Sequence, residues 1–319
     1  MESIKDMTDK ENWGDKALEK ISQTAFSEQR KARRWGIFFK LATLIYLSIL
    51  LFFFISGNDK KIATTGYFTA LISINGEIGS ESEANANDFK RNLNDAYNNP
   101  GTKGIILSIN SPGGSPVQAG IMNDEIRRLK SQYPQIPIYA VVEDICASGA
   151  YYVAVATDSI FVDKASIVGS IGVLMDGFGF EETINKLGIE RRLMTAGNNK
   201  ALLDPFSPIN PKHKAHVQDL LDQIHQQFIN VVMDGRGEKL KKGKEEIFSG
   251  LFWNGEKSIK LGLTDYLGDL DYVAREIIGH EQIEDFTTYE TFADRFAKQL
   301  GVSIGSEIRG KFFNNFVLK

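Results

Sequence analysis

The chain has 319 residues, enough for one large domain or two small ones. Its formal net charge is −4, so no excess of basic residues indicates a nucleic acid as partner. Cys146 is the single cysteine, which excludes an intrachain disulfide, and no histidine and cysteine cluster has zinc-site spacing. With 42% hydrophobic and 24% charged residues, the composition is that of a folded protein.

An apolar segment near the N-terminus has the length of a membrane span. Residues 35–57 are nearly all apolar, and residues 37–55 would extend about 28 Å as a helix, close to a bilayer core. Lys40 lies one turn inside the segment, from where its amine can reach the interface. A buried core helix is the alternative, but the segment has no polar face, which favours lipid.

The charges that flank this segment predict its orientation. Four basic residues precede it closely: Arg30, Lys31, Arg33 and Arg34. Only Lys60 and Lys61 closely follow, so the positive-inside rule places the N-terminus in the cytoplasm and the rest outside. No small-residue cleavage site follows the apolar run, and we therefore expect an uncleaved signal anchor.

Four regions follow from this pattern. We expect a polar cytoplasmic tail with some helix over residues 1–34, a transmembrane anchor over 35–57 and an extracytoplasmic domain over 58–288. The last region, 289–319, carries apolar residues at helical spacing and is expected to be an amphipathic tail. It could dock on the body of the protein, on a partner or on the membrane.

Strands and helices alternate through the central region. In chain order, the pattern predicts a strand over 67–74, a helix over 84–99, a strand over 102–110, a helix over 117–131, a strand over 136–142, a helix that opens near 148, strands over 159–163 and 169–175, and a helix over 211–233. Several of these strands are continuous apolar runs, which are typical of parallel strands buried on both faces. The favoured fold class is therefore α/β.

Ser148 stands among small residues where a strand gives way to a helix. The surrounding sequence reads CASGAYYVA, and glycine and alanine next to the serine leave room for a ligand. A serine there is either a packing residue at a tight turn or a nucleophile at a helix N-terminus. Because a serine hydroxyl alone is a poor nucleophile, the second interpretation requires a base.

The sequence offers two kinds of base. The histidines are His213, His216, His225 and His280, none of which has a glycine-rich context, and all four are most simply solvated surface residues. A lysine can serve only if its pKa, about 10.4 in water, falls by about 3 units through burial. Among the lysines, Lys200 stands apart, because small, apolar and turn residues surround it.

A pair of glycines could supply the donors that acyl transfer needs. Residues 110–115 read NSPGGS at a strand-to-helix turn, where backbone N–H groups can approach a ligand closely. The alternative is an ordinary turn between a strand and a helix. The pattern does not fit GxxxxGK[ST], which disfavours a nucleotide-binding P-loop.

Four motifs together resemble the signal peptide peptidase A and SohB family of membrane-anchored serine proteases, peptidase family S49. They are INSPGGS at 109–115, CASGAYYVA at 146–154, VGSIGV at 168–173 and GNNKALLDPFSP at 197–208, in the order and at spacings similar to those of the family. The resemblance covers residues 65–280. One departure is Ala150, where glycine is common in the family.

The resemblance implies a fold and a mechanism. It implies a crotonase/ClpP-like βαβ spiral domain, with Ser148 as nucleophile and Lys200 as general base. The backbone N–H groups of Gly114 and Gly149 would form the oxyanion hole, and Ser170 would orient the lysine amine. The expected reaction is hydrolysis of apolar peptides, such as cleaved signal peptides, through an acyl-enzyme, without a metal or organic cofactor.

The resemblance also implies an assembly and a location. In half-length family members, the serine and the lysine come from adjacent subunits of a homo-oligomeric ring, octameric where known. The ring would lie on the outer face of the bacterial inner (cytoplasmic) membrane, with apolar grooves for signal-peptide remnants. The expected partners are therefore peptides, the lipid bilayer and further copies of the chain.

Two other functions stay open. A crotonase-type acyl-CoA enzyme would use a similar oxyanion hole with carboxylates as acid and base, and Glu143 and Asp144 are the site-adjacent candidates. A domain outside the cytoplasm, away from CoA, argues against this function. A non-catalytic membrane ring scaffold would need neither Ser148 nor Lys200.

Overall fold

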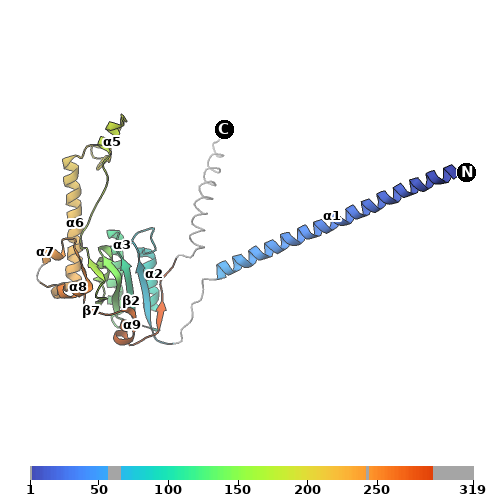
Figure 1. Ribbon diagram of the computed structural model, residues 1–319. Helices are drawn as coiled ribbons and strands as arrows, with labels where there is room; N and C mark the ends of the chain where they lie inside the picture. The colour runs from blue at the N-terminus through green and yellow to red at the C-terminus, as the bar shows by residue number, and fades with distance from the viewer. Residues whose placement is uncertain (1, 57–65, 242–243, 290–319) are drawn as a thin grey trace, which may run out of the picture. The chain divides into compact units, whose positions relative to one another are not determined.

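The computed structural model describes residues 2–56, 66–241 and 244–289 (Figure 1). The sheet and the helices around it belong to one compact unit, Thr64–Glu290. The long N-terminal helix belongs to a separate unit and is described by itself.

The N-terminal helix α1 runs from Glu2 to Ser56 without a break. The tail expected over residues 1–34 is therefore continuously helical from Glu2, in a stretch rich in alanine, glutamate, lysine and glutamine, which are good helix formers. Within the described part of the chain, no helix combines the length and apolar character needed to cross a membrane. The expected span 35–57 continues into residues 50–57, whose side chains lie outside the described residues, as does the tail from 290 onward.

The described strands are β1 Phe68–Asn75, β2 Thr102–Ser111, β3 Ile138–Ala147, β4 Ser159–Val162, β5 Ile167–Gly169, β6 Phe252–Asn254, β7 Tyr266–Leu267 and β8 Ile283–Asp285. The described helices after α1 are α2 Ala86–Asn98, α3 Pro116–Gln132, α4 Gly149–Ala154, α5 Glu181–Lys186, α6 Pro211–Arg236, the short turn η1 Gly237–Lys239, α7 Lys244–Ile247, α8 Gly255–Leu261, α9 Leu270–Tyr272 and η2 Val273–Ile278. This alternation confirms the α/β class.

The strands form one sheet whose main path is β6-β5-β3-β2-β1-β8. All described pairs are parallel except β5 with β6. Strand β3 has two neighbours on one side, since Tyr139–Val142 pair with β4 and Ile145–Ala147 pair with β5. The end of β5 therefore lies beside Ala147, the residue before Ser148.

Both faces of the sheet are covered by apolar side chains. On one face, residues of α2, α3, α4 and α6 pack on the strands, among them Leu93, Met122, Tyr151 and Val232. On the other face, a smaller cluster joins Ile106, Val141 and Phe161 to Val273 and Ala274 of η2. Full burial of a valine, leucine, isoleucine, phenylalanine or methionine side chain contributes about 1.5–3 kcal/mol. Burial on both faces explains why the strands read as continuous apolar runs.

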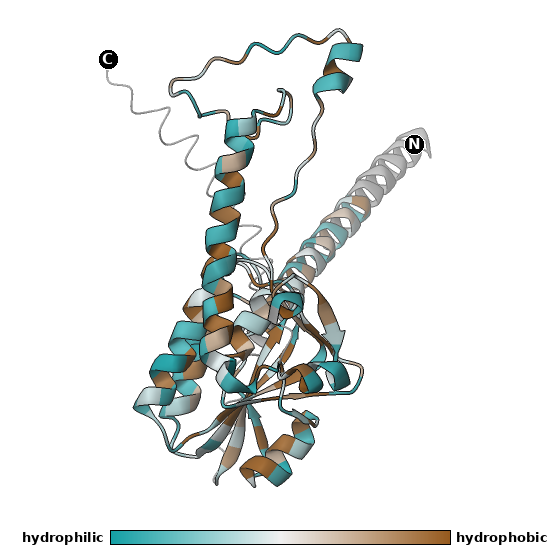
Figure 2. Ribbon diagram, turned by 90° about the vertical axis from the view of Figure 1, so that its left-hand side faces the viewer, coloured by the Kyte–Doolittle hydropathy of each residue, from teal (hydrophilic) through white to brown (hydrophobic). Residues whose placement is uncertain are grey.

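One predicted strand is misplaced. The strand expected over 169–175 does not form beyond its first residue, because β5 spans Ile167–Gly169. Gly169 has φ 122° and Ser170 has φ 52°, and both values depart from the extended backbone that a strand requires. The chain after Ser170 leaves the sheet and rises to the far end of α6 (Figure 2).

Candidate active site

Ser148 occupies the turn between β3 and α4, in a strained backbone conformation. Its φ is 52° and its ψ is −123°, a region that costs a residue with a side chain about 1–3 kcal/mol. The turn is held from both sides, because the Ser148 N–H donates to the Gly169 carbonyl at 2.8 Å and its carbonyl accepts from the Tyr152 N–H at 3.0 Å. Strain maintained by surrounding bonds is typical of functional sites.

Gly114 lies in the turn between β2 and α3 and requires glycine for two reasons. Its φ is 145°, and a Cβ on it would lie 2.1 Å from the carbonyl oxygen of Ile78. The chain approaches Ile78 because the Ile78 N–H donates to Gly113 and the Ser115 N–H donates to Ile78, each at 2.8 Å. The donors of these two bonds are the N–H groups of Ile78 and Ser115, so the Gly114 N–H takes part in neither of them.

The amides of Gly114 and Gly149 lie close together. A Cβ on Gly149 would be 3.2 Å from the Gly114 nitrogen. Gly149 is the first residue of α4, where N–H groups have no partner within the helix, and the Ser148 side chain does not cap them. Two such N–H groups beside a serine hydroxyl are the arrangement that stabilises a tetrahedral oxyanion.

Ser170 directly follows β5 and lies beside the same turn. Its φ of 52° is strained like that of Ser148, and its N–H donates to the Leu251 carbonyl at 2.7 Å. Gly169, the residue before it, accepts the hydrogen bond from the Ser148 N–H. The two serines are therefore joined through a single backbone link.

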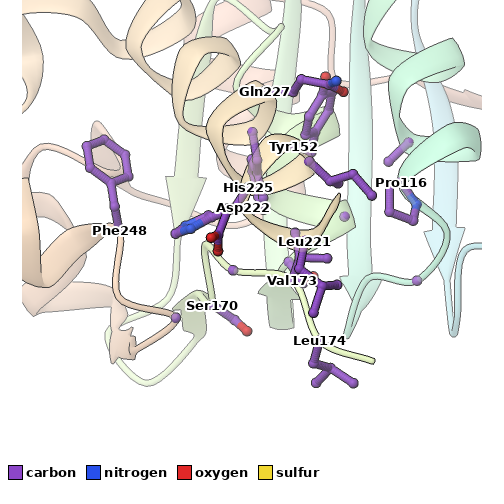
Figure 3. Close-up of a pocket in the computed structure, with 18 of the residues that line it drawn as sticks. Pro116, Tyr152, Ser170, Val173, Leu174, Leu221, Asp222, His225, Gln227 and Phe248 are labelled. Atoms are coloured by element: carbon purple, nitrogen blue, oxygen red, sulfur yellow. The ribbon is translucent and has the colours of Figure 1, made fainter. Parts of the chain in front are cut away.

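One pocket of about 720 Å³ brings these residues together (Figure 3). Ser148, Gly149, Gly114 and Ser170 all line it. Apolar side chains form much of its wall: Val173, Leu174, Leu221, Ile224, Phe228 and Phe248. A concave pocket with an apolar wall and a few polar groups beside a strained serine is a candidate active site.

Lys200 lies elsewhere in the single chain. It is exposed, and it is not among the residues that line the pocket. It belongs to a turn in the long segment between β5 and α6, where its N–H donates to the Gly197 carbonyl at 3.1 Å. Of the residues predicted for the site, the structure therefore brings together Ser148, Gly149, Gly114 and Ser170 but not Lys200.

The carboxylates considered for acyl-CoA chemistry also lie apart from the pocket. Glu143 accepts a hydrogen bond from the Ser108 hydroxyl, and Asp144 accepts one from Asn110 at 3.2 Å. Neither is among the described residues that line the pocket. No acid and base pair for that chemistry is therefore formed beside Ser148 by these residues.

Much of the chain is similar to known proteins. The model of peptidase family S49 matches residues 130–284. A putative protease of Methanocaldococcus jannaschii is 31% identical over 242 residues, which cover 73% of this chain and 76% of that protein. The chain belongs to peptidase family S49. A putative signal peptide peptidase SppA of Enterococcus faecium is 26% identical over 241 residues, covering 73% of this chain and 67% of that protein.

Another relative is much longer than this S49 chain. A Na⁺/H⁺ antiporter NhaA of Brucella melitensis is 43% identical over 187 residues, which cover 59% of this chain. The chain spans about a quarter of the length of that relative, as the match covers 25% of it. What is similar is therefore a part of a longer protein.

The segment that carries Lys200 has a small packed cluster of its own in this S49 chain. Arg191 pairs with Asp204 at 2.8 Å, and the side chain of Asp204 is only 7% exposed. The Arg191 guanidinium also lies 5.1 Å from the ring centre of Phe206, and the ring centres of Phe206 and Phe180 are 5.7 Å apart. The Phe180 N–H donates to the Pro205 carbonyl at 2.6 Å. This group, Phe180, Arg191, Asp204 and Phe206, is called the clasp below.

The sequence interpretation missed His225, which is half-buried and lines the pocket of this S49 chain with Ser148 (Figure 3). The expectation that all four histidines are solvated surface residues is therefore wrong for His225. Its position held a signal, because it follows Leu221 by four residues and precedes Phe228 by three, which places it near the buried face of α6. Asp222, one turn earlier, lines the same pocket.

Proposed function

We propose that the chain is a serine endopeptidase that cleaves peptides through an acyl-enzyme at Ser148. The observation that carries this proposal is the strained Ser148 beside the adjoining amides of Gly114 and Gly149 in one pocket. Membership of peptidase family S49 supports the reaction class. The parallel strands and alternating helices also agree with a crotonase/ClpP-like spiral, which we propose as the finer fold assignment.

In this mechanism the neutral amine of Lys200 takes the proton of the Ser148 hydroxyl as its oxygen attacks the peptide carbonyl carbon. The N–H groups of Gly114 and Gly149 stabilise the oxyanion of the tetrahedral intermediate. The lysine then gives the proton to the leaving amine, and the acyl group stays on Ser148. A water molecule, deprotonated by the same amine, releases the acid product and restores the hydroxyl. Ser170 accepts or donates a hydrogen bond that orients the amine.

The lysine comes from a second copy of the chain in this proposal. Lys200 is exposed and outside the pocket of its own chain, and the segment around it has large exposed apolar side chains. They include Leu174, Phe178, Leu187, Ile189, Met194 and Ile209. Burial of these side chains against a neighbour would dry the site and favour the uncharged amine. A head-to-tail contact of this kind forms a ring when its rotation closes on the first copy, and we propose the octameric ring that the family resemblance implies.

The proposed substrates are apolar peptides in extended conformation, including the remnants of cleaved signal peptides. The apolar wall formed by Val173, Leu174 and Phe248 supports apolar side chains near the scissile bond. A relative in Enterococcus faecium carries the name of a putative signal peptide peptidase. An extended peptide keeps its backbone N–H and C=O groups free, so these groups can form hydrogen bonds with the protein.

We also propose that the chain is anchored in the bacterial inner (cytoplasmic) membrane by residues 35–57, with the domain on the extracytoplasmic side. The support is the apolar run and the basic residues that precede it. The full chain should stay with the membrane fraction after extraction at alkaline pH. Release into the supernatant would overturn the anchor and leave the peptidase proposal intact.

Two variants test the proposed activity directly. Ser148→Ala and Lys200→Ala should each lower the turnover of an apolar peptide by at least about a thousandfold, because each removes a participant in proton transfer or bond formation. A fluorophosphonate probe should label the wild type at Ser148 and should not label Ser148→Ala. Turnover close to that of the wild type in either variant would overturn the assignment.

A further inference from the structure

We propose that His225 is a positioning residue that holds the backbone carrying Ser170 and, through it, Ser148. Its Nε2 lies 3.1 Å from the carbonyl oxygen of Ile171, the residue after Ser170. The catalytic consequence rests on the proposed function, whereas the tie itself rests on geometry. We define the His225 tie as this one hydrogen bond between α6 and the end of β5.

The tie holds a segment that would relax without support. Ser148 and Ser170 each have φ 52°, and such values persist only where surrounding bonds fix them. The Ser170 N–H is held by the Leu251 carbonyl at 2.7 Å, and His225 holds the carbonyl of the next residue, Ile171. Ser170 is thus bounded on both sides by hydrogen bonds to different parts of the fold.

The same segment fixes the nucleophile. Gly169 accepts the hydrogen bond from the Ser148 N–H at 2.8 Å, and Gly169 directly precedes Ser170. A rotation of the backbone at Ser170 or Ile171 would therefore move the acceptor that holds the Ser148 turn. A displacement of about 1 Å at a reacting group can lower the rate about a hundredfold.

The chemistry of the imidazole fits the role of donor. A carbonyl oxygen only accepts, so Nε2 of His225 must carry the hydrogen. The neutral form is then the Nε2–H tautomer, and the imidazolium keeps the same donor. A glutamine at this position also has a terminal N–H group at similar reach, whereas a leucine fills the space without a donor.

The carbonyl group that accepts the His225 tie belongs to a buried residue, which makes loss of this hydrogen bond costly. Ile171 is fully buried in the main core, so its carbonyl would lose its partner in a place that has little access to water. A buried polar group that loses its hydrogen bond costs about 1–3 kcal/mol, and relaxation of the segment is the way to avoid this cost.

The test compares His225→Leu, His225→Gln and the control His216→Leu in the full chain. His216 is an exposed histidine on the same helix. Amide hydrogen exchange over residues 167–173 should quicken about tenfold in His225→Leu, the equivalent of one lost hydrogen bond, and stay near wild type in His225→Gln and in the control. Equal exchange in His225→Leu and wild type would overturn the tie.

Kinetics then test the consequence for the site. His225→Leu should lower kcat by about 10-fold to 100-fold with little change in KM, and His225→Gln should recover most of the loss. If His225→Gln is as impaired as His225→Leu, the imidazole acts in another way and positioning by a donor is wrong. Failure of the peptidase proposal would look different, since the wild type would then take up no probe at Ser148 while the exchange comparison still decides the tie.

Discussion

Ser148 and Ser170, the two serines of the pocket, share a φ of 52° and are joined by one hydrogen bond, from the Ser148 N–H to the carbonyl of Gly169. The register that pairs Ala147 with Gly169 creates this link. The position of the nucleophile therefore depends on how β5 pairs with the end of β3. A change that shifts β5 should affect both serines together.

Gly114→Ala should lower kcat by at least about a hundredfold, the usual loss for one oxyanion donor. The added Cβ would collide with the Ile78 carbonyl oxygen, and the alanine would have to adopt a φ of 145°, which strains a residue with a side chain. Gly120→Ala in α3 is the matched control, because a Cβ there meets nothing within 4 Å. The control should keep full activity and gain up to about 1 kcal/mol of stability through helix propensity. Peptide turnover and thermal unfolding of both variants decide the matter, and an active Gly114→Ala would contradict the oxyanion role.

The clasp should hold the turn that carries Lys200 in place. The Asp204 N–H donates to the carbonyl of Ala201, the residue after Lys200, at 3.3 Å, and the Asp204 side chain pairs with Arg191. Asp204→Asn and Arg191→Gln each break this pair, so each should lower kcat on an apolar peptide by about tenfold to a hundredfold through displacement of the proposed base.

The double variant Asp204→Asn/Arg191→Gln serves as the control. Because the two side chains act as one pair, its loss of kcat should be close to that of either single variant and smaller than the sum of both. Full turnover in either single variant would show that the clasp does not position the proposed base.

Part of the stability of the fold should depend on the ion pair between Arg236, the last residue of α6, and Asp265. Asp265 accepts two hydrogen bonds from Arg236, and both side chains are buried. Burial raises the pKa of Asp265, but its hydrogen bonds and the charge of Arg236 outweigh this and hold the pKa below the ordinary value of 3.8. A carboxyl with a lowered pKa stabilises the fold fully above that value, and this contribution is lost as the pH falls below it.

Asp265→Asn should therefore lower the stability at neutral pH by about 3 kcal/mol, since it leaves a buried guanidinium without its charge partner. Thermal unfolding between pH 7 and pH 2.5 should show a steeper loss below pH 4 in the wild type than in the variant. Parallel curves for the two proteins would rule out a role of Asp265 in acid stability.

Cys146 should be inert in the folded chain although it lies two residues from Ser148. Its side chain is fully buried, and burial raises the pKa of the thiol well above its ordinary value. Because the thiolate is the reactive form, iodoacetamide at pH 8 should label the protein only after denaturation. Labelling of the native protein at the denatured rate would mean that the end of β3 opens readily.

The sequence predicted the strands over 102–110 and 136–142 well, because continuous apolar runs of this length are typical of parallel strands buried on both faces of a sheet. It also predicted the turns at Gly114 and Ser148, where small residues mark the chain reversals. The strand expected over 169–175 was misplaced, because β5 ends at Gly169 and the positive φ of Ser170 is set by bonds to distant residues such as Leu251. No local pattern encodes such bonds.

His225 was missed for a related reason. A histidine on a helix has the same local pattern whether it faces water or a carbonyl of another element, and Ile171 is 54 positions away in the sequence. The site for Lys200 is a different case, because the base proposed for one chain is expected to act in its neighbour. In this proposal, only the assembled protein brings Lys200 and Ser148 together.

Co-expression of Ser148→Ala and Lys200→Ala chains in equal amounts tests the shared site most directly. If each site takes its serine from one chain and its lysine from the next in a ring, random assembly gives about one quarter of the sites both intact groups. We predict that peptide turnover returns to about one quarter of the wild-type level, while each variant alone stays inactive. A mixture as inactive as either variant alone would contradict a site composed of Ser148 and Lys200 from two chains.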